Sequence, residues 1–323
     1  MSEISGSLNL LQELHNCRIC PRECGADRFS ARLGWCNAGA GFNISSICAH
    51  QGEEPAISGK QGICNIFFSR CNLACIYCQN WQISSRKEPA AGLGMEFSEV
   101  IGRIVDLLDG GCHAVGFVSP SHHVPQVKAI IEAVRESGRN PVFVYNTNGY
   151  DKAETLKSLE TYIDIYLPDF KYMDASLAKE YSEADDYPEV ALSALKEMYR
   201  QKGSVLLCNH DGYAEKGIIL RHLILPGHTD NSIAVLRKIA GDVSSSLTIS
   251  LMAQYWPVPQ VASHRQLGRP ITPEEYERVT SELQALGFYK GWIQELDSQN
   301  NYLPDFNQQH PFGKAVGDGD SED

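Results

Sequence analysis

The sequence predicts an α/β protein built around a mainly parallel sheet, and three observations support that fold class. Hydrophobic residues make up 43% of the 323 residues and charged residues 21%, which is typical of a globular chain with a substantial core. Six short apolar runs alternate along the chain with stretches of helical pattern. Each run is apolar almost throughout, as are strands that a parallel sheet buries on both faces. The length suits one large domain, alone or with a small appendage.

The expected strands and helices alternate between residues 63 and 252. The strand-like runs are residues 63–69, 113–119, 141–147, 163–170, 217–225 and 246–252. The helical stretches lie near residues 96–109, 124–137, 151–160, 187–202 and 229–240. This alternation predicts parallel pairing with right-handed crossovers. The sheet can be doubly wound or can curl into a barrel. An incomplete six-unit barrel fits the count, because a full eight-fold barrel needs two more strand–helix units.

The composition divides the chain into a core and its flanking segments. We expect a Cys-rich metal-binding extension over residues 1–60, the strand–helix core over 61–256, a C-terminal segment packing on that core over 257–309, and a flexible acidic tail over 310–323. The C-terminal segment should contain one helix at residues 273–286. Thr272 is its expected N-cap, and Pro273 occupies the first helical position.

Charge and hydropathy exclude several classes of partner. The formal net charge is −12, and an acidic body disfavours nucleic acid. The first sixteen residues have no basic start followed by an apolar run, so we expect no secretory signal. No stretch approaches the ~20 apolar residues that cross a bilayer. We therefore expect a cytoplasmic protein without membrane association, in which clustered cysteines bind metal and do not form disulfides.

Three closely spaced cysteines follow the first expected strand. Cys71, Cys75 and Cys78 form a C-x3-C-x2-C pattern, and thiolates are soft ligands suited to iron–sulfur clusters and zinc. Three cysteines on one loop can hold three irons of a cubane cluster, which leaves the fourth iron open to a substrate or cofactor. The loop also leaves the carboxyl end of a strand, where catalytic groups gather in such folds. The alternatives are three packed thiols, or a zinc site with a remote fourth ligand.

This motif, with Tyr77 before its last cysteine, resembles the radical S-adenosylmethionine (SAM) superfamily. The phrases IFFSRCNLACIYCQN, HQGEEPAISG, CRICPRECG and LRHLILPG together resemble the uncharacterised branch related to pyruvate formate-lyase activating enzyme, over most of residues 15–260. The resemblance implies an incomplete (β/α)6 TIM-like barrel. It also implies a [4Fe–4S] cluster on the three cysteines, with SAM chelating the fourth iron. One electron would then cleave SAM to methionine and a 5′-deoxyadenosyl radical that abstracts hydrogen from a substrate.

Polar residues at the ends of the next strands are expected to face the same opening. In the activating enzymes a Gly-Gly-Glu segment after the second strand binds the SAM amino group. Here Ser119, Ser121 and His122 occupy that place and are expected to contact SAM instead. The alternative is that Ser121 caps the following helix.

The remaining cofactor-binding residues are carried over from the same resemblance. Asn146 and Asn148 end the third strand, and Asp169 and Lys171 end the fourth, where the activating enzymes hold a monovalent cation near SAM. Asn146 replaces an acid of that pattern. Asp169 and Lys171 could instead form a surface pair of little energetic weight. Arg221 lies inside an apolar strand, so it needs a partner, and the SAM carboxylate is the natural one. Gln254 follows the sixth strand and completes the set.

A second group of cysteines lies near the N-terminus. Cys17, Cys20, Cys24 and Cys36 form a C-x2-C-x3-C-x11-C pattern typical of a four-thiolate metal site. The pattern suits a second [4Fe–4S] cluster and a structural zinc ion about equally well. A small thiol-rich loop without metal is the remaining alternative.

The leading functional hypothesis is a radical SAM oxidoreductase that abstracts hydrogen from a protein or peptide, in its specific version an activase of a glycyl radical enzyme. The alternative is a radical SAM enzyme that acts on a small molecule, or that modifies a peptide without leaving a stable radical. A third class is a non-catalytic iron–sulfur or zinc redox module, against which the strand-end residues argue. Either radical version needs a low-potential electron donor such as flavodoxin or ferredoxin.

Overall fold

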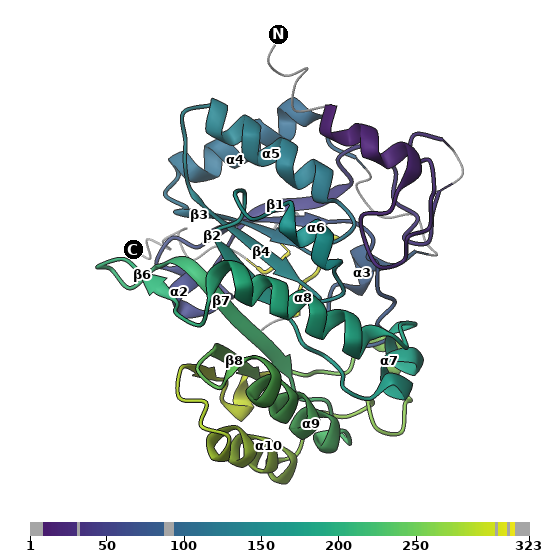
Figure 1. The fold of residues 1–323 in the computed structure, drawn as a ribbon, viewed down its shortest axis with the longest axis vertical. Helices are drawn as coiled ribbons and strands as arrows, with labels where there is room; N and C mark the ends of the chain where they lie inside the picture. Colours follow the sequence, from purple (N-terminus) through teal and green to yellow (C-terminus); the bar gives the residue numbers. More distant parts are fainter. Residues whose placement is uncertain (1–8, 31–32, 87–93, 301–302, 309–310, 314–323) are drawn as a thin grey trace, which may run out of the picture.

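The computed structural model describes residues 9–30, 33–86, 94–300, 303–308 and 311–313. The described chain forms a nine-stranded sheet in the order β1-β2-β3-β4-β5-β7-β8-β9, with β6 paired to β7 (Figure 1). The strands are β1 (Ile44–His50), β2 (Ile63–Phe68), β3 (Ala114–Val118), β4 (Val142–Thr147), β5 (Ile165–Pro168), β6 (Leu207–Cys208), β7 (Ala214–Leu223), β8 (Thr248–Met252) and β9 (Gly291–Ile293).

The six expected strands are confirmed as β2, β3, β4, β5, β7 and β8, and each pairs in parallel with its neighbour in that series. The sheet ends at β1 on one side and β9 on the other, so it curves without closing. It is therefore an open partial barrel and not a doubly wound sheet. Every residue of β2, β3, β5 and β8 is buried, as their apolar sequences predict.

Besides the two-residue β6, two edge strands were not predicted. β1 lies within the Cys-rich extension and pairs antiparallel with β2, and β9 lies in the C-terminal segment and pairs in parallel with β8. Their sequences carry no continuous apolar run, because β1 has two serines and β9 has only three residues. The sheet thus continues across both boundaries assigned from composition.

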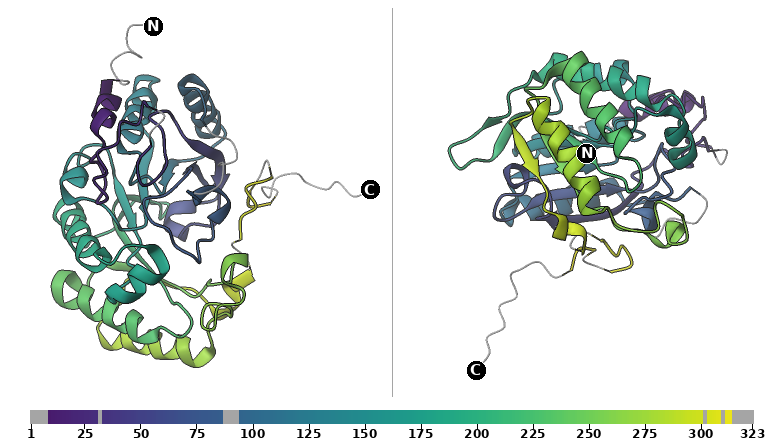
Figure 2. Two further views of the ribbon diagram at one scale, coloured as in Figure 1. Left: turned by 90° about the vertical axis from the view of Figure 1, so that its right-hand side faces the viewer. Right: turned by 90° about the horizontal axis from the view of Figure 1, so that it is seen from below.

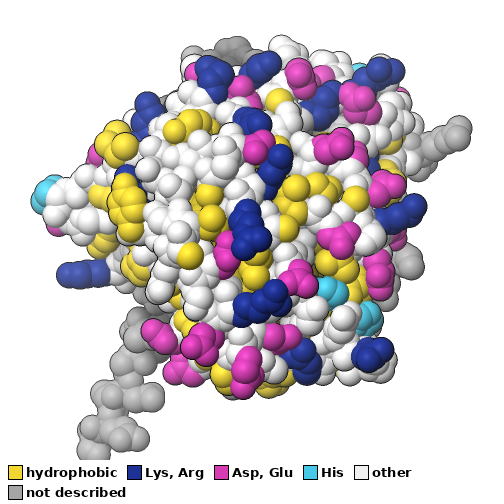
Figure 3. Space-filling view, turned by 60° about the horizontal axis from the view of Figure 1, so that its bottom comes forward, with side chains coloured by type: hydrophobic (Ala, Val, Ile, Leu, Met, Phe, Trp, Pro, Cys, Tyr) yellow, Lys and Arg dark blue, Asp and Glu magenta, His cyan; other side chains and the backbone are white. Residues whose placement is uncertain are grey.

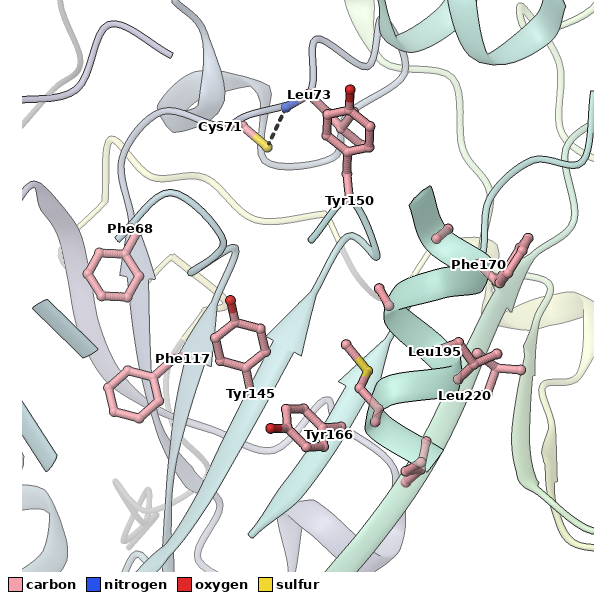
Figure 4. Packing of buried hydrophobic residues seen from close by; sticks show 14 of the residues in the cluster. Phe68, Cys71, Leu73, Phe117, Tyr145, Tyr150, Tyr166, Phe170, Leu195 and Leu220 are labelled. Carbon is pink, nitrogen blue, oxygen red and sulfur yellow. Dashed lines mark hydrogen bonds between the residues drawn. The ribbon is translucent and has the colours of Figure 1, made fainter. Parts of the chain in front are cut away.

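Helices cover the outer face of this sheet (Figures 1 and 2). The predicted helices are α4 (Phe97–Asp109), α5 (Val124–Glu136), α6 (Ala153–Lys157), α8 (Tyr187–Lys202) and α9 (Thr229–Ile239). The α-helices not predicted are α2 (Pro55–Ser58), α3 (Trp81–Ser84) and α7 (Ala175–Ser182). The short 3-10 helices at Asn9–Asn16, Pro259–Val261 and Leu296–Asn300 and a π-helical turn at Ala240–Ser244 were not predicted either. The sheet's outward side chains form the main core with these helices, and Figure 4 shows Phe117, Tyr145 and Tyr166 side by side, with Leu195 on the neighbouring helix α8.

The inner face of the sheet is closed at one end by α2. Ala56 and Ile57 pack against side chains from the first residues of the parallel strands, including Ile63, Ala114 and Ile165. The α2 plug (residues 55–58) therefore sits at the amino ends of the strands and leaves the carboxyl ends free.

In the C-terminal segment, α10 (Pro273–Ala285) lies beside α9. Thr272 is confirmed as the N-cap: its Oγ1 accepts from Glu275 N at 3.2 Å, and Glu275 Oε2 accepts from Thr272 N at 2.9 Å. Phe312, within the range assigned to the tail, packs on His50 and Phe67. Residues 310 and 314–323 lie outside the described chain. Each described helix is too short or too polar to traverse a lipid bilayer.

Candidate active site

A cavity of about 660 Å³ lies between the loop after β2, the carboxyl ends of the strands and the segment that leads into α2. Most of the sequence-predicted site residues line it: Cys71, Cys75, Tyr77, Cys78, Ser119, Asn146, Asn148, Asp169, Lys171, Arg221 and Gln254. The topology explains their meeting, because the carboxyl ends of parallel strands converge at one edge of the sheet.

The cysteine loop (residues 71–78) is held in place by the end of α7. Ala74 N donates to Ser182 O at 3.2 Å, and Ile76 N donates to Tyr181 O at 2.9 Å. The last carbonyls of a helix have no partner inside it, so the loop satisfies acceptors that would otherwise remain unpaired. At the other end of α7, Asp174 caps the helix by accepting from Ser176 N at 2.8 Å.

Each thiol of this loop accepts a hydrogen bond from a different element. Asn148 Nδ2 donates to Cys71 Sγ at 3.2 Å. The hydroxyls of Ser182 and Ser84 donate to Cys75 and Cys78 at 3.0 and 3.3 Å. Such donors stabilise the thiolate form, in which cysteine binds metal.

Burial opposes the same charge. Burial, with a smaller contribution from the neighbouring thiols, raises the pKa of the Cys71 thiol to about 12 and that of Cys75 to about 11. Figure 4 shows Cys71 next to the backbone N–H of Leu73, which lies 3.4 Å from its sulfur. The loop thus provides donors for three thiolates, but a bound cation must supply most of the energy that deprotonates them.

Asp169 and Lys171 form a partly buried pair at the cavity wall, and not a surface pair. Lys171 Nζ lies 2.5 Å from Asp169 Oδ2, with side chains only 16% and 22% exposed. Burial by itself would lower the pKa of Lys171, but the attraction of Asp169 and Cys75 outweighs burial and raises it. The ammonium group therefore stays charged beside the cysteine loop, where it also lowers the pKa of Cys75.

Arg221 has two partners that the sequence analysis did not identify. Its Nε and Nη2 donate to the two carboxylate oxygens of Glu54 at 2.8 and 2.6 Å, and Nη2 also contacts Glu53. The side chain of Arg221 is 12% exposed, that of Glu54 5% and that of Glu53 8%. Glu53 Oε1 also accepts from Asn65 Nδ2 at 2.7 Å. The sequence did contain a signal for this pairing. A buried arginine needs an acidic partner, and the adjacent glutamates Glu53 and Glu54 directly precede the Pro-Ala-Ile-Ser segment.

Arg221 in this structure is therefore paired within the chain. Glu54 accepts two hydrogen bonds from the guanidinium of Arg221. Together with Glu53, these three side chains carry a net charge of one negative unit. Attraction by an added carboxylate is weaker for such a group than for an isolated arginine. All three side chains line the cavity.

Ser121 and His122 do not line the cavity, so the expectation that they face it is wrong. Ser119 adopts a left-handed conformation (φ 55°), and the chain turns sharply after β3. Ser121 Oγ then meets Thr147 Oγ1 at 2.9 Å, and His122 Nε2 hydrogen-bonds to Ser69 O at 3.1 Å. The helix-cap alternative for Ser121 is also wrong, because the N-cap of α5 is His123.

The N-terminal cysteines lie near one another beside the cysteine loop. Burial, with smaller contributions from nearby Cys36, Cys17 and Cys24, raises the pKa of Cys20 to about 12. Arg22 Nε donates to Asn72 O at 3.1 Å and joins this segment to the cysteine loop. Across the described residues, no three His, Cys, Asp or Glu side chains converge as they would around one metal ion.

Comparison with known proteins places this site in a family. The family model of the Radical SAM superfamily matches residues 65–239, which is more than half of the chain. The uncharacterized protein MJ0674 of Methanocaldococcus jannaschii is 26% identical over 270 residues, which cover 81% of this chain and 72% of that protein.

Similar solved structures include SuiB of Streptococcus suis bound to precursor peptide SuiA, with a TM-score of 0.45 and 13% identity over 70% of this chain. HydG, a maturase of the [FeFe]-hydrogenase, aligns with a TM-score of 0.48 and 12% identity over 90% of this chain. A mutant of spore photoproduct lyase aligns with a TM-score of 0.48 and 10% sequence identity. The alignment covers 78% of this chain and 79% of that chain. This chain spans only 47% of SuiB and 63% of HydG. From the extent of the family match, this protein belongs to the radical SAM superfamily, whose domain implies a [4Fe–4S] cluster and SAM.

Proposed function

We propose that Cys71, Cys75 and Cys78 hold the [4Fe–4S] cluster and that the 660 Å³ cavity beside them binds SAM. The observation that carries this assignment is that one loop brings the three thiols to the same cavity as Asp169 and Lys171. The donor set fits the group, because three thiolates with separate hydrogen-bond donors can ligate three irons and leave the fourth open. When bound, the cluster supplies the electron that cleaves the SAM sulfonium.

The chain's own residues have three tasks in this proposal. The carbonyls at the end of α7 fix the cysteine loop, and the α2 plug excludes water from the amino ends of the strands. Asp169, Lys171, Asn146 and Gln254 surround the cavity with groups that can orient a zwitterionic, hydroxyl-bearing ligand. A monovalent cation near Asp169 belongs to the same proposal.

We propose further that the substrate is a protein or peptide, and in the specific version a glycyl radical enzyme activated by this chain as in the pyruvate formate-lyase activating enzyme branch. The sheet does not close between β1 and β9, and an open barrel can admit a loop of a large partner. The alternative is a small-molecule substrate, or peptide modification without a stable radical, which a cavity of this size accommodates equally well.

The N-terminal cysteines and the electron donor complete the proposed assignment. We propose that Cys17, Cys20, Cys24 and Cys36 bind a second cluster or zinc, within a Cys-rich extension that precedes the barrel. Flavodoxin or ferredoxin would supply electrons in the cytoplasm. Such donors are typically acidic and need basic groups to dock on, and Figure 3 shows a face on which Lys and Arg side chains are interspersed with Asp and Glu.

The assignment of the cluster is tested by anaerobic reconstitution. The wild-type chain should bind iron and sulfide, show a cluster signal in electron paramagnetic resonance (EPR) after dithionite reduction, and convert SAM to 5′-deoxyadenosine and methionine. Cys75→Ala should lose the conversion. The matched control is Cys208→Ala, which removes an exposed thiol on β6, away from the cavity, and should keep both iron and turnover. A Cys75→Ala variant with wild-type SAM cleavage would refute the assignment.

The substrate class is tested by isotope transfer. Deuterium should appear in 5′-deoxyadenosine when the label is in a partner protein, and a glycyl radical signal should accompany it if the chain is an activase. Label transferred from a metabolite instead would favour the small-molecule alternative. A reduced, cluster-loaded chain that leaves SAM intact would favour the redox module.

A further inference from the structure

Three hydroxyl groups in the structure form a continuous chain that ends on one of the cluster cysteines. Tyr77 OH lies 2.5 Å from Tyr172 OH, which lies 2.8 Å from Ser182 Oγ, and Ser182 Oγ donates to Cys75 Sγ at 3.0 Å. Tyr172 and Ser182 are completely buried, and Tyr77 is 6% exposed and lines the cavity. The chain therefore runs from the cavity wall to the sulfur of Cys75 with little access to water.

The direction of every hydrogen bond in this chain follows from counting hydrogens. A hydroxyl has one hydrogen to donate. Ser182 gives its hydrogen to Cys75, so it must accept from Tyr172, and Tyr172 must then accept from Tyr77. All three O–H groups thus point toward the cysteine sulfur. Hydrogen bonds aligned in this way polarise one another, so the Ser182 donor is stronger than an isolated serine.

The surrounding structure fixes these groups. The ring of Tyr172 packs edge-on against Tyr187 with 5.3 Å between centroids, and Ser182 is the last residue of α7, whose carbonyl holds Ala74. Cys71 and Cys78 also accept hydrogen bonds, from Asn148 and Ser84. Among the described residues, neither donor continues a chain of hydroxyls.

We propose that the Tyr77–Tyr172–Ser182 relay is a positioning device that raises the reduction potential of the cluster held by Cys75. This inference rests on the proposed function. Reduction adds one electron from an external one-electron donor and makes the cluster and its thiolates more negative. A donor aimed at a ligand sulfur stabilises the more negative state, and hydrogen bonds to the sulfurs are among the factors that set cluster potentials. No proton is transferred along the relay.

The proposal is tested by EPR-monitored redox titration of the full, reconstituted chain without SAM. Ser182→Ala removes the terminal donor, and we expect the equilibrium constant for reduction by a given donor to fall about tenfold, or about 59 mV for one electron. Tyr172→Phe keeps the ring and the Ser182 donor but removes its polarisation, so the shift should have the same sign and be smaller. Ser182→Thr retains a hydroxyl and should restore the wild-type potential.

A matched control is Tyr166→Phe, which deletes a buried tyrosine hydroxyl that donates to Gln201, away from the cysteine loop. It should leave the potential unchanged. If the N-terminal cysteines also hold a cluster, its midpoint should not move in any variant and serves as an internal reference.

The outcomes separate this inference from the proposed function. A wild-type chain that assembles no cluster on the cysteine loop overturns both. Ser182→Ala and Tyr172→Phe with full cluster content and wild-type potentials overturn the relay alone. If Ser182→Ala fails to fold, Tyr172→Phe decides, because it retains the backbone and the serine that hold the loop; an unchanged potential there overturns the relay.

Discussion

Replacing Arg221 with methionine tests how far the buried acid pair depends on its cation. The substitution keeps a long apolar side chain in β7 but leaves Glu53 and Glu54, which are 8% and 5% exposed, without the guanidinium that contacts both. Removing one partner of a buried ion pair costs about 3–5 kcal/mol, because the remaining charge stays desolvated and uncompensated. We expect the free energy of unfolding to fall by that amount at pH 7.

The loss should depend on pH in a direction that the structure fixes. Burial by itself would raise the pKa of Glu53, but Arg221, with further help from Asn65, outweighs burial and holds it below its ordinary value. In the wild type, Glu53 therefore stabilises the fold above that ordinary pKa, and the contribution is lost as pH falls through the lower folded value. In Arg221→Met, burial is no longer opposed by this cation, so the carboxyl group protonates at higher pH and the penalty shrinks toward pH 4–5.

The assay is anaerobic urea unfolding followed by tryptophan fluorescence at pH 5 and pH 7.5. Arg139→Met is the control, because it breaks an exposed pair with Asp109 and should barely move the midpoint. A loss below about 1 kcal/mol in Arg221→Met, or a loss that is the same at both pH values, would contradict the ion-pair reasoning.

Three further predictions use the same chain. Thr272→Ala removes the side-chain half of the α10 capping box and should lower the free energy of unfolding by about 1 kcal/mol, measured by urea unfolding, with SAM cleavage unchanged. Gly116→Ala places a Cβ 2.1 Å from Asn65 Oδ1, and we expect a loss of about 1–3 kcal/mol in the same assay; wild-type stability would mean that this amide can turn aside. Cys20→Ala should lower the iron or zinc content of the anaerobically purified chain, measured by elemental analysis, and an unchanged content would argue against a metal at the N-terminal cysteines.

The parts of this structure that short segments of sequence encode could be predicted. Each of the six central strands is apolar over its own length, and Thr272 with Glu275 forms a cap within one turn, so no distant residue is needed to recognise them. Cys71 and Asp169 follow expected strands, so parallel topology places them at one edge of the sheet, whereas Arg221 was expected inside a strand and was assigned to the site from the family resemblance.

The remainder depends on contacts between distant residues. Glu53 and Arg221 are 168 residues apart, and only the packing of α2 beneath the barrel brings them together. Ser182 was not recognised because its role requires α7 to end against the cysteine loop. Ser121 and His122 were misplaced because the left-handed conformation at Ser119 is unusual for a residue other than glycine, asparagine or aspartate.

The α2 plug blocks one end of the barrel. Its apolar residues fill the space between the starting residues of five strands, so a ligand cannot pass through the barrel from end to end. A small ligand and a larger partner must therefore approach from the carboxyl ends of the strands or through the opening between β1 and β9. The blocked end thus fixes the side of the barrel on which molecules exchange with solvent.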